Sequence, residues 1–170
     1  QGEPVMAKET ILVPGDHNVE NAMAAIAVAK LLNQENGAIR TTLEKFTGVK
    51  HRTQFVTEFE ERRFYNDSKA TNTLATENAL KGFNVPVVLL AGGLDRGNGF
   101  DDLIPSMSGK VKALIVFGET ATKLAETGEK AGIPTIISVQ NVEAAVPVAY
   151  ELSEAKDVIL LSPACASWDQ

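Results

Sequence analysis

The sequence predicts an α/β fold: a doubly wound, mostly parallel sheet that begins near residue 49 and follows a separate helical segment. Two observations predict it. Four short apolar runs show no alternation with polar residues, as in strands buried on both faces, and they occupy residues 86–91, 113–117, 135–139 and 158–162. Helical stretches follow or separate the strands, as in chains whose parallel strands are joined by helices, and they occupy residues 73–80, 119–131 and 142–153.

The segment before the sheet is predicted to contain two helices. The first occupies residues 19–32, where apolar side chains recur at a spacing near 3.6 residues, and the second occupies residues 38–46. Gly48 opens a short linker. We therefore expect two parts, residues 1–47 and residues 48–170.

The second part is expected to open with a β-hairpin. Its two strands are residues 54–59 and 62–66, with Glu60 and Glu61 at the tip. The sheet then continues with the four apolar runs.

The composition of the 170-residue chain excludes several classes of protein. Its net charge of −6 argues against general nucleic-acid binding, which needs a basic face. Cys165 is the single cysteine, so the chain has no internal disulfide and fits a reducing compartment. The chain has neither a bilayer-spanning apolar run nor a signal-peptide pattern, so we expect a cytoplasmic protein. The two histidines provide neither a metal-binding cluster nor a Ser-His-Asp arrangement.

Three polar loops follow predicted strands, where parallel sheets gather their ligands. In the first loop, residues 67–72, Lys69 and Thr71 precede a helix whose first N–H groups suit a phosphate or carboxylate. An ordinary polar turn with Asn72 as the helix N-cap explains the same residues about equally well.

The second loop, residues 92–97, is rich in glycine, which permits close approach of the backbone to a ligand. Arg96 could bind a carboxylate or phosphate with Asp95 orienting it, although a plain glycine turn is favoured on this pattern alone. No Gly-Lys-Ser/Thr follows, so the loop is not a P-loop.

The third loop, residues 163–169, places Ser167 as the N-cap of a helix that begins at Trp168. Its N–H groups could hold a carboxylate, and a simple capped helix is the favoured alternative. Cys165 has no base partner in the sequence, which favours a small buried residue over a nucleophile.

Two further features lie upstream of these loops. Asn18 and Asn21 are three residues apart and share a helix face, where their amides could contact the edge of an adenine. Asn18 could equally be a helix cap. His51 and Arg52 lie at the linker, where a surface cation is the usual explanation.

Taken together, five segments occur in the order found in the Mur ligase family, which the sequence resembles from about residue 13 to residue 170. They read GDHNVENA at residues 15–22, HR at 51–52, NDSKATN at 66–72, GGLDRG at 92–97 and LSPACAS at 161–167. The string NDSKATN is similar to the D-glutamate-adding members and differs from those that add alanine or a diamino acid.

The resemblance implies that residues 1–47 end a central ATP-binding domain. Residues 48–170 would form most of a Rossmann-like C-terminal domain, truncated at its last helix. The implied reaction adds D-glutamate to UDP-N-acetylmuramoyl-L-alanine in peptidoglycan synthesis. ATP phosphorylates the substrate carboxylate to an acyl phosphate, and the D-glutamate amine then displaces phosphate, with Mg²⁺ on the nucleotide phosphates.

The resemblance also implies roles for individual residues. Lys69 would lie near the transferred phosphoryl group as the catalytic residue. The nucleotide-binding residues would be Asn18, Asn21, Arg52 and Asp67. The D-glutamate-binding residues would be Thr71, Arg96, Ser167 and Trp168. None of these residues is expected to bind a metal ion directly.

Two departures from the family set the remaining expectations. Arg96 stands where some relatives have lysine. The Walker-type loop and the UDP-binding domain have no counterpart here, so the 170-residue chain alone is expected to be inactive, with ATP and Mg²⁺ held mainly by absent parts. We expect a monomer that binds neither nucleic acid nor membrane. The alternatives are a stand-alone α/β nucleotide- or anion-binding module and another such ligase, for example a folylpolyglutamate synthase.

Overall fold

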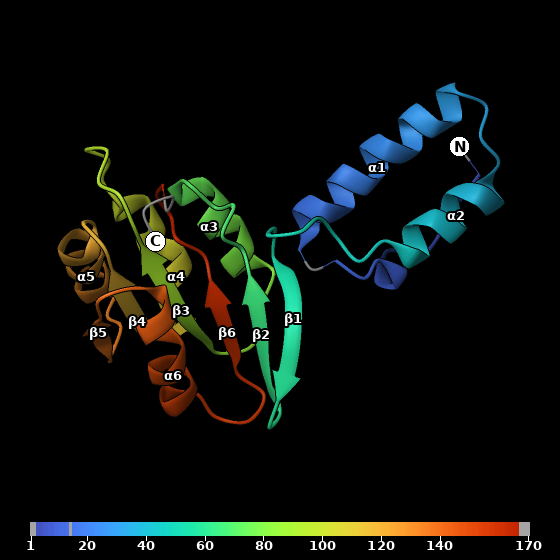
Figure 1. Cartoon of the computed structure of the whole chain (residues 1–170). Coiled ribbons are helices and arrows are strands. Elements are labelled where there is room, and N and C mark those ends of the chain that lie inside the picture. Colours follow the sequence, from blue (N-terminus) through green and yellow to red (C-terminus); the bar gives the residue numbers. More distant parts are fainter. Residues whose placement is uncertain (1–2, 14, 167–170) are drawn as a thin grey trace. The chain divides into compact units, whose positions relative to one another are not determined.

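The computed structural model describes residues 3–13 and 15–166, and the chain divides into two compact units, Gln1–Val49 and Lys50–Gln170 (Figure 1). The first unit contains η1 (Lys8–Thr10), α1 (Asp16–Leu31) and α2 (Asn36–Lys45). The second contains β1 (Gln54–Phe59), β2 (Arg62–Asn66), α3 (Thr73–Lys81), β3 (Val87–Gly92), η2 (Asp101–Leu103), α4 (Ile104–Met107), β4 (Val111–Phe117), α5 (Ala121–Lys130), β5 (Ile136–Ser138), α6 (Val142–Leu152) and β6 (Val158–Leu161).

The first unit has a small core. Of its described residues, Ala22 and Ile39 are the buried apolar ones, whereas Met23, Val28 and Leu31 are exposed. Between α1 and α2 lies an apolar groove of about 190 Å³. Two helices that leave this much apolar surface in water gain little stability from their own packing.

Helix α1 begins three residues earlier than the sequence predicts. Gly15, with φ of 98°, precedes the helix, and Asp16 lies in the first turn. The early start is invisible to apolar periodicity because this turn is polar. The acidic side chain of Asp16 suits the positive end of the helix dipole and also pairs with Lys8 Nζ at 2.7 Å.

The described residues of the second unit form a six-stranded sheet with the order β1-β2-β6-β3-β4-β5. Strand β1 is antiparallel to β2, and every other neighbouring pair is parallel. Val88 in β3 lies between Ile159 in β6 and Ala113 in β4, so an apolar row crosses the centre of the sheet. The predicted α/β fold class is confirmed.

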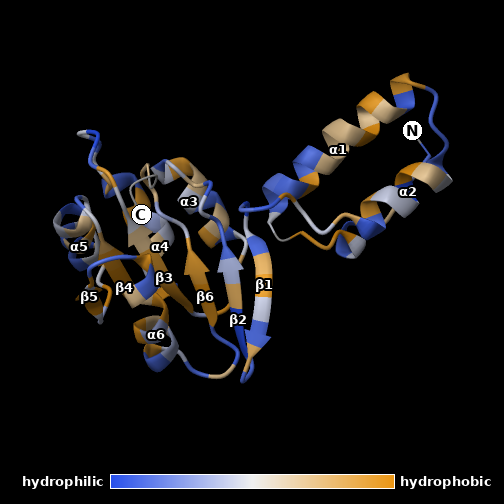
Figure 2. Cartoon of the chain, viewed as in Figure 1, coloured by the Kyte–Doolittle hydropathy of each residue, from blue (hydrophilic) through white to orange (hydrophobic). Residues whose placement is uncertain are grey.

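Helices cover both faces of this sheet. Leu80 of α3, Met107 of α4 and Leu124 of α5 belong to the core on one face, and Ala145 and Ala149 of α6 pack on the other. Figure 2 shows the hydrophobic character of β3, β4 and β6, in contrast to the mixed hairpin β1–β2. Three of the four apolar runs, at residues 86–91, 113–117 and 158–162, therefore became the central strands β3, β4 and β6. The fourth, at residues 135–139, contains the edge strand β5, whose residues are only partly buried or exposed, so the prediction of burial on both faces is wrong there.

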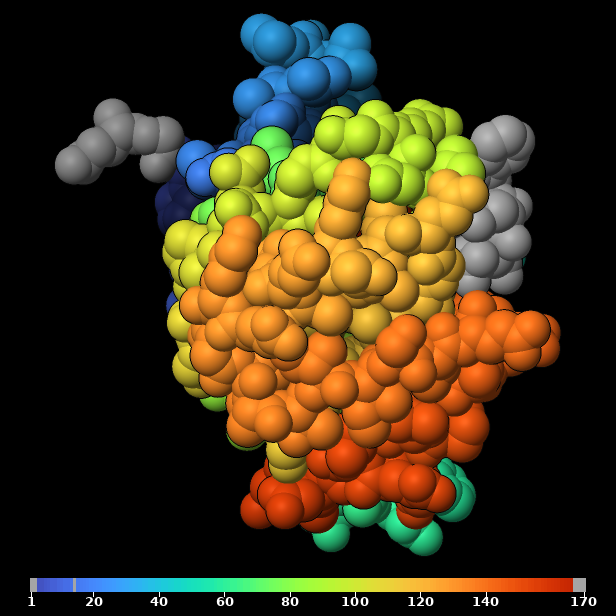
Figure 3. Space-filling view, turned by 90° about the vertical axis from the view of Figure 1, so that its left-hand side faces the viewer, coloured from blue at the N-terminus to red at the C-terminus, as the bar shows by residue number. Residues whose placement is uncertain are grey.

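The strand order follows from the chain path. Strands β3, β4 and β5 succeed one another outward, and α6 then crosses the opposite face and returns β6 between β2 and β3. Figure 3 looks onto the side that carries α5, β5 and α6. No helix in the part of the chain that the structure describes is long and apolar enough to cross a membrane.

Candidate functional site

The loops that follow β2, β6 and β3 are neighbours at the carboxyl edge of the sheet, because β6 lies between the other two strands. Contacts join the second loop to the third. The amide of Gly92 donates to Pro163 O at 3.1 Å, and that of Leu94 donates to Ala166 O at 2.7 Å. Segments distant in sequence thus form one continuous rim.

Asp67, the first residue after β2, connects the first loop to the end of β6. Its side chain is buried, with 6% of its surface exposed. Ser162 Oγ donates to Oδ2 at 2.8 Å, and the Thr53 amide donates to Oδ1 at 2.9 Å. Burial raises the pKa of the Asp67 carboxyl, while the donors on Ser162 and Thr53 and the charge of Arg52 oppose that rise.

Lys69 and Thr71 are exposed on the same loop. The backbone is fixed there, since the Lys69 amide donates to His51 O at 3.1 Å and the Ala70 amide to Asp67 O at 2.8 Å. No carboxylate of the described residues forms an ion pair with Lys69. Its ammonium is therefore available to an anion on this loop.

Asn72 caps α3, as the alternative interpretation of the first loop expected. Its Oδ1 accepts from the Ala75 amide at 2.9 Å. The cap and an anion site are compatible, because the side chain of Asn72 occupies only one of the free N–H groups at this helix end.

In the second loop the expected pairing of Asp95 with Arg96 is corrected. The described contacts of the Asp95 carboxylate are Lys123 Nζ at 2.6 Å and the Gly97 amide at 2.8 Å. The hydrogen bond from Lys123 lowers the pKa of Asp95. Arg96 is exposed next to this pair, and none of the described carboxylates forms an ion pair with it. Lys123, rather than Arg96, is the partner of Asp95, because α5 begins at the carboxyl edge of the sheet and carries Lys123 in its first turn.

Gly92 ends β3 with φ of 143°, and a Cβ there would clash with the carbonyl oxygen of Phe117 at the end of β4. This close approach of two strand ends is the reason for a glycine at this position. The sequence analysis expected close approach of this loop to a ligand, and the structure shows close approach between two strands of the protein instead.

Cys165 is buried, as expected. Its Sγ contacts Pro163 O at 3.3 Å and Thr120 Oγ1 at 3.4 Å. Ser167 and Trp168, the expected D-glutamate ligands of the third loop, lie outside the described residues.

Asn18 and Asn21 lie in the first unit, on the first two turns of α1. The Asn21 side-chain amide donates to Asn18 Oδ1 at 3.5 Å, so the two share a helix face as predicted. Asn18 as a cap is wrong, because the N-cap is Gly15 and Asn18 lies inside the helix.

Thr53 and Ser162 were missed by sequence reasoning. Each contacts Asp67 from a different segment, one just before β1 and the other just after β6. A signal existed for Ser162, because it and Asp67 each follow directly on a strand. To predict the contact from that signal, one must also know that β6 pairs with β2, and the pattern of apolar residues does not indicate which strands pair.

Residues 51–165 match the family described as Mur ligase, glutamate ligase domain. The chain belongs to this family. Two Mur ligase relatives with 63% and 61% identity, each over 99% of the chain, are the UDP-N-acetylmuramoylalanine–D-glutamate ligases of Listeria monocytogenes serotype 4b and Geobacillus kaustophilus. The chain spans 36% and 38% of their lengths. The family predicted from the five ordered segments is confirmed.

Solved structures share the Mur ligase fold at low identity. A UDP-N-acetylmuramate-alanine ligase from Thermotoga maritima has a TM-score of 0.69 at 19% identity, over 89% of this chain and 35% of its own. A folylpolyglutamate synthase from Mycobacterium tuberculosis with ADP has a TM-score of 0.70 at 16% identity, over 91% of this chain and 39% of its own. At these identities the likeness concerns the fold alone.

Proposed function

We propose that the chain is part of a longer ATP-dependent ligase that adds D-glutamate to UDP-N-acetylmuramoyl-L-alanine in peptidoglycan synthesis. The observation that carries this proposal is the identity of about 60% across almost the whole chain with relatives named for that reaction. Folylpolyglutamate synthases share only the fold, so they favour no second activity. A stand-alone binding module fits less well, because the chain matches little more than a third of each relative.

The carboxyl edge of the sheet fits an anionic nucleotide. Arg52, Asp67 and Lys69 would bind the nucleotide, with Lys69 as the catalytic residue at the transferred phosphoryl group. Asn18 and Asn21 would contact adenine. The support is the exposed ammonium of Lys69 and the conformation of its loop, which backbone hydrogen bonds fix before any ligand arrives.

Magnesium would accompany the nucleotide rather than occupy a site of this chain. The described residues contain no group of three His, Cys, Asp or Glu side chains that could hold a metal ion. The protein ligands of Mg²⁺ are therefore proposed to lie in other parts of the full polypeptide, with the nucleotide phosphates completing its shell.

The D-glutamate site would combine Thr71 and Arg96 with Ser167 and Trp168. D-Glutamate brings two carboxylates, and an exposed guanidinium can bind a carboxylate through two parallel hydrogen bonds. The Asp95–Lys123 ion pair supports this assignment, because it leaves the charge of Arg96 unneutralised by its neighbour.

The first unit is proposed to be the end of an ATP-binding domain, with the boundary to the C-terminal domain near residue 48. The support is its exposed apolar surface, which includes Met23, Val28 and Leu31 and the groove between α1 and α2. Further segments of the same domain would cover this surface. Because the rest of that domain is needed, we expect the isolated chain to be inactive. For the complete enzyme we propose a monomer in the cytoplasm.

The test is steady-state kinetics on the full-length protein. Lys69→Ala should lower kcat by about 100-fold or more, because a cation at the transferred phosphoryl group acts mainly in the transition state. Arg96→Ala should raise the KM for D-glutamate by about 10- to 100-fold with a smaller change in kcat.

Lys81→Ala is the matched control, because Lys81 is an exposed lysine on α3 whose partner is Glu77 in the same helix. It should leave both constants unchanged. A wild-type enzyme that accepts L-glutamate as well as D-glutamate would contradict the proposed substrate. An unchanged D-glutamate KM in Arg96→Ala would remove Arg96 from the site.

A further inference from the structure

Residues 51–53, at the start of the second unit, have an unusual backbone. His51 has φ of 66° and Thr53 has φ of 41°, so two non-glycine residues in the left-handed region flank Arg52. A β-branched residue such as Thr53 rarely adopts this conformation. Strain of this kind persists only where surrounding contacts impose it, and it is common at functional sites.

The contacts that impose this conformation come from the loop after β2 and from the first residue of β1. The Thr53 amide donates to Asp67 Oδ1 at 2.9 Å, and His51 O accepts from the Lys69 amide at 3.1 Å. The His51 amide donates to Gln54 Oε1 at 3.0 Å. Both residues beside Arg52 are thus fixed by hydrogen bonds, while the Arg52 side chain remains exposed.

The His51 ring takes part through Asn66, the last residue of β2. Asn66 Oδ1 accepts from the Ser68 amide at 2.9 Å, which can only donate, so the orientation of the Asn66 amide group is settled. Its Nδ2 therefore donates to His51 Nδ1 at 3.2 Å. His51 Nδ1 is the acceptor in this contact, because the NH₂ group of an amide can only donate.

The anchor beneath these residues is rigid. Asp67 Oδ2 accepts from Ser162 Oγ at 2.8 Å, and Ser162 Oγ lies 2.9 Å from Thr76 Oγ1 in α3. Thr53 donates to Asp67 Oδ1 through its hydroxyl as well as its amide, at 3.5 Å and 2.9 Å, so three hydrogen bonds hold the carboxylate. Residues 51–53 are therefore tied to β2, β6 and α3 together.

We infer that His51 and Asn66 are positioning residues that hold Arg52 in the orientation in which it binds the nucleotide. The inference rests on the proposed function, because it takes a nucleotide as the ligand of Arg52. Its physical content is preorganisation: an arginine whose neighbours are already fixed loses less conformational freedom when it binds a phosphate.

The test measures binding of a non-hydrolysable ATP analogue with Mg²⁺ to the full-length protein by calorimetry. His51→Gly permits the left-handed φ without strain but removes the ring, so the segment becomes flexible. We expect the Kd to rise about 10-fold, with little change in Tm. His51→Asn should restore most of the affinity, because its side-chain oxygen can accept from Asn66 and asparagine tolerates the left-handed region.

A double-mutant cycle separates positioning from a general structural role. In an Arg52→Ala background His51→Gly should cause no further loss of affinity, because the residue to be positioned is gone. Asn66→Ala provides a second route to the same loss if His51→Gly folds poorly. Additive losses with Arg52→Ala, or a lower Tm with unchanged affinity, would overturn the inference. The binding assay contains no amino acid, so failure of the D-glutamate assignment would appear only in the kinetic experiment.

Discussion

The two ends of the sheet carry similar polar residues but use them differently. At the carboxyl edge, Lys69 and Arg96 are exposed on loops whose backbones are held by hydrogen bonds. At the amino edge, Arg62 is half-buried and each of its nitrogens has a partner within the protein. Lys69 and Arg96 thus face solvent at one edge, whereas Arg62 at the other edge has its partners within the protein.

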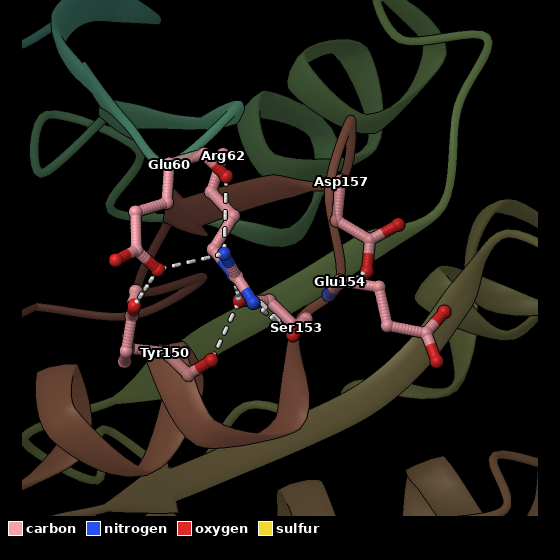
Figure 4. Close-up of polar contacts among 6 residues, drawn as sticks. All are labelled: Glu60, Arg62, Tyr150, Ser153, Glu154 and Asp157. Carbon is pink, nitrogen blue, oxygen red and sulfur yellow. Dashed lines mark hydrogen bonds and ion pairs between the residues drawn. The ribbon is translucent and has the colours of Figure 1, made fainter.

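The amino-edge contacts form what we term the Arg62 cluster: Glu60, Arg62, Tyr150 and Ser153 (Figure 4). Arg62 Nε donates to Ser153 Oγ at 3.0 Å, and its terminal nitrogens donate to Glu60 O at 3.0 Å and Ser153 O at 3.2 Å. Its guanidinium also lies 4.7 Å from the centroid of the Tyr150 ring, and the Tyr150 hydroxyl donates to Glu60. The cluster fastens the tip of the β1–β2 hairpin to the end of α6.

This difference distinguishes structural charge from functional charge. A guanidinium whose hydrogen bonds are made within the protein contributes to stability and offers little to a ligand. An exposed cation on a fixed loop contributes little to stability and retains its full interaction for an anion. Mutations at the two edges should therefore separate stability from activity.

The largest stability effect is expected for Arg62→Ala. The change removes several hydrogen bonds and a cation–π contact and leaves Ser153 O without its partner, so the free energy of unfolding should fall by about 2–3 kcal/mol. Urea unfolding measures it, with Lys81→Ala as a surface control expected to cost less than about 0.5 kcal/mol. If Arg62→Ala lowered the ligase activity at temperatures well below unfolding, the conclusion that Arg62 serves stability alone would be wrong.

Asp67→Asn should have a smaller effect on stability and a large one on nucleotide binding. Asparagine can still accept from the Thr53 amide and can donate to Ser162, so the variant should lie within about 1 kcal/mol of wild type near neutral pH. The change nevertheless replaces one carboxylate acceptor with an amide donor at the proposed nucleotide site, so kcat/KM for ATP in the full-length protein should fall more than 10-fold.

The pH dependence of Asp67→Asn identifies the cause. Burial raises the folded-state pKa of Asp67 above its ordinary 3.8, so the folded protein takes up this proton at a higher pH than the unfolded chain. The contribution of Asp67 to stability therefore increases as pH falls through the folded-state pKa towards 3.8 and decreases as pH rises. The variant lacks this dependence, so its stability relative to wild type should improve with increasing pH. Parallel stability curves for the two proteins would contradict burial as the cause.

Much of the fold could be predicted from local pattern. Strands β3 and β6 and residues 113–117 of β4 are continuous apolar runs, as expected for strands covered on both faces. The hairpin turn at Glu60 and Glu61 is also confirmed, with both residues in the left-handed region. The rim of loops was also predictable in outline, since the carboxyl ends of parallel strands meet at one edge.

The individual partners in the site could not be predicted, because they depend on strand order and helix placement. Lys123 reaches Asp95 from α5, and Ser162 reaches Asp67 only because β6 returns between β2 and β3. Nothing in the spacing of these residues indicates either contact. The strained backbone beside Arg52 is similarly invisible, because threonine, the residue at position 53, rarely adopts the left-handed region.

The smallest effect concerns Tyr150, a partly buried member of the Arg62 cluster. Its hydrogen bond to Glu60 raises the pKa of the phenol above the ordinary 10.0. The stability that this bond contributes should be present below pH 10 and lost as pH rises through the folded-state pKa, because ionisation removes the donated proton. The chain has two tyrosines, so an absorbance titration of wild type and Tyr150→Phe isolates this group.

Glu60→Gln should lower the pKa of Tyr150, since it removes the adjacent charge that opposes ionisation. An unchanged titration in Glu60→Gln would mean that the hairpin tip is not fastened to α6 through this pair, and the Arg62 cluster would then depend on its guanidinium alone.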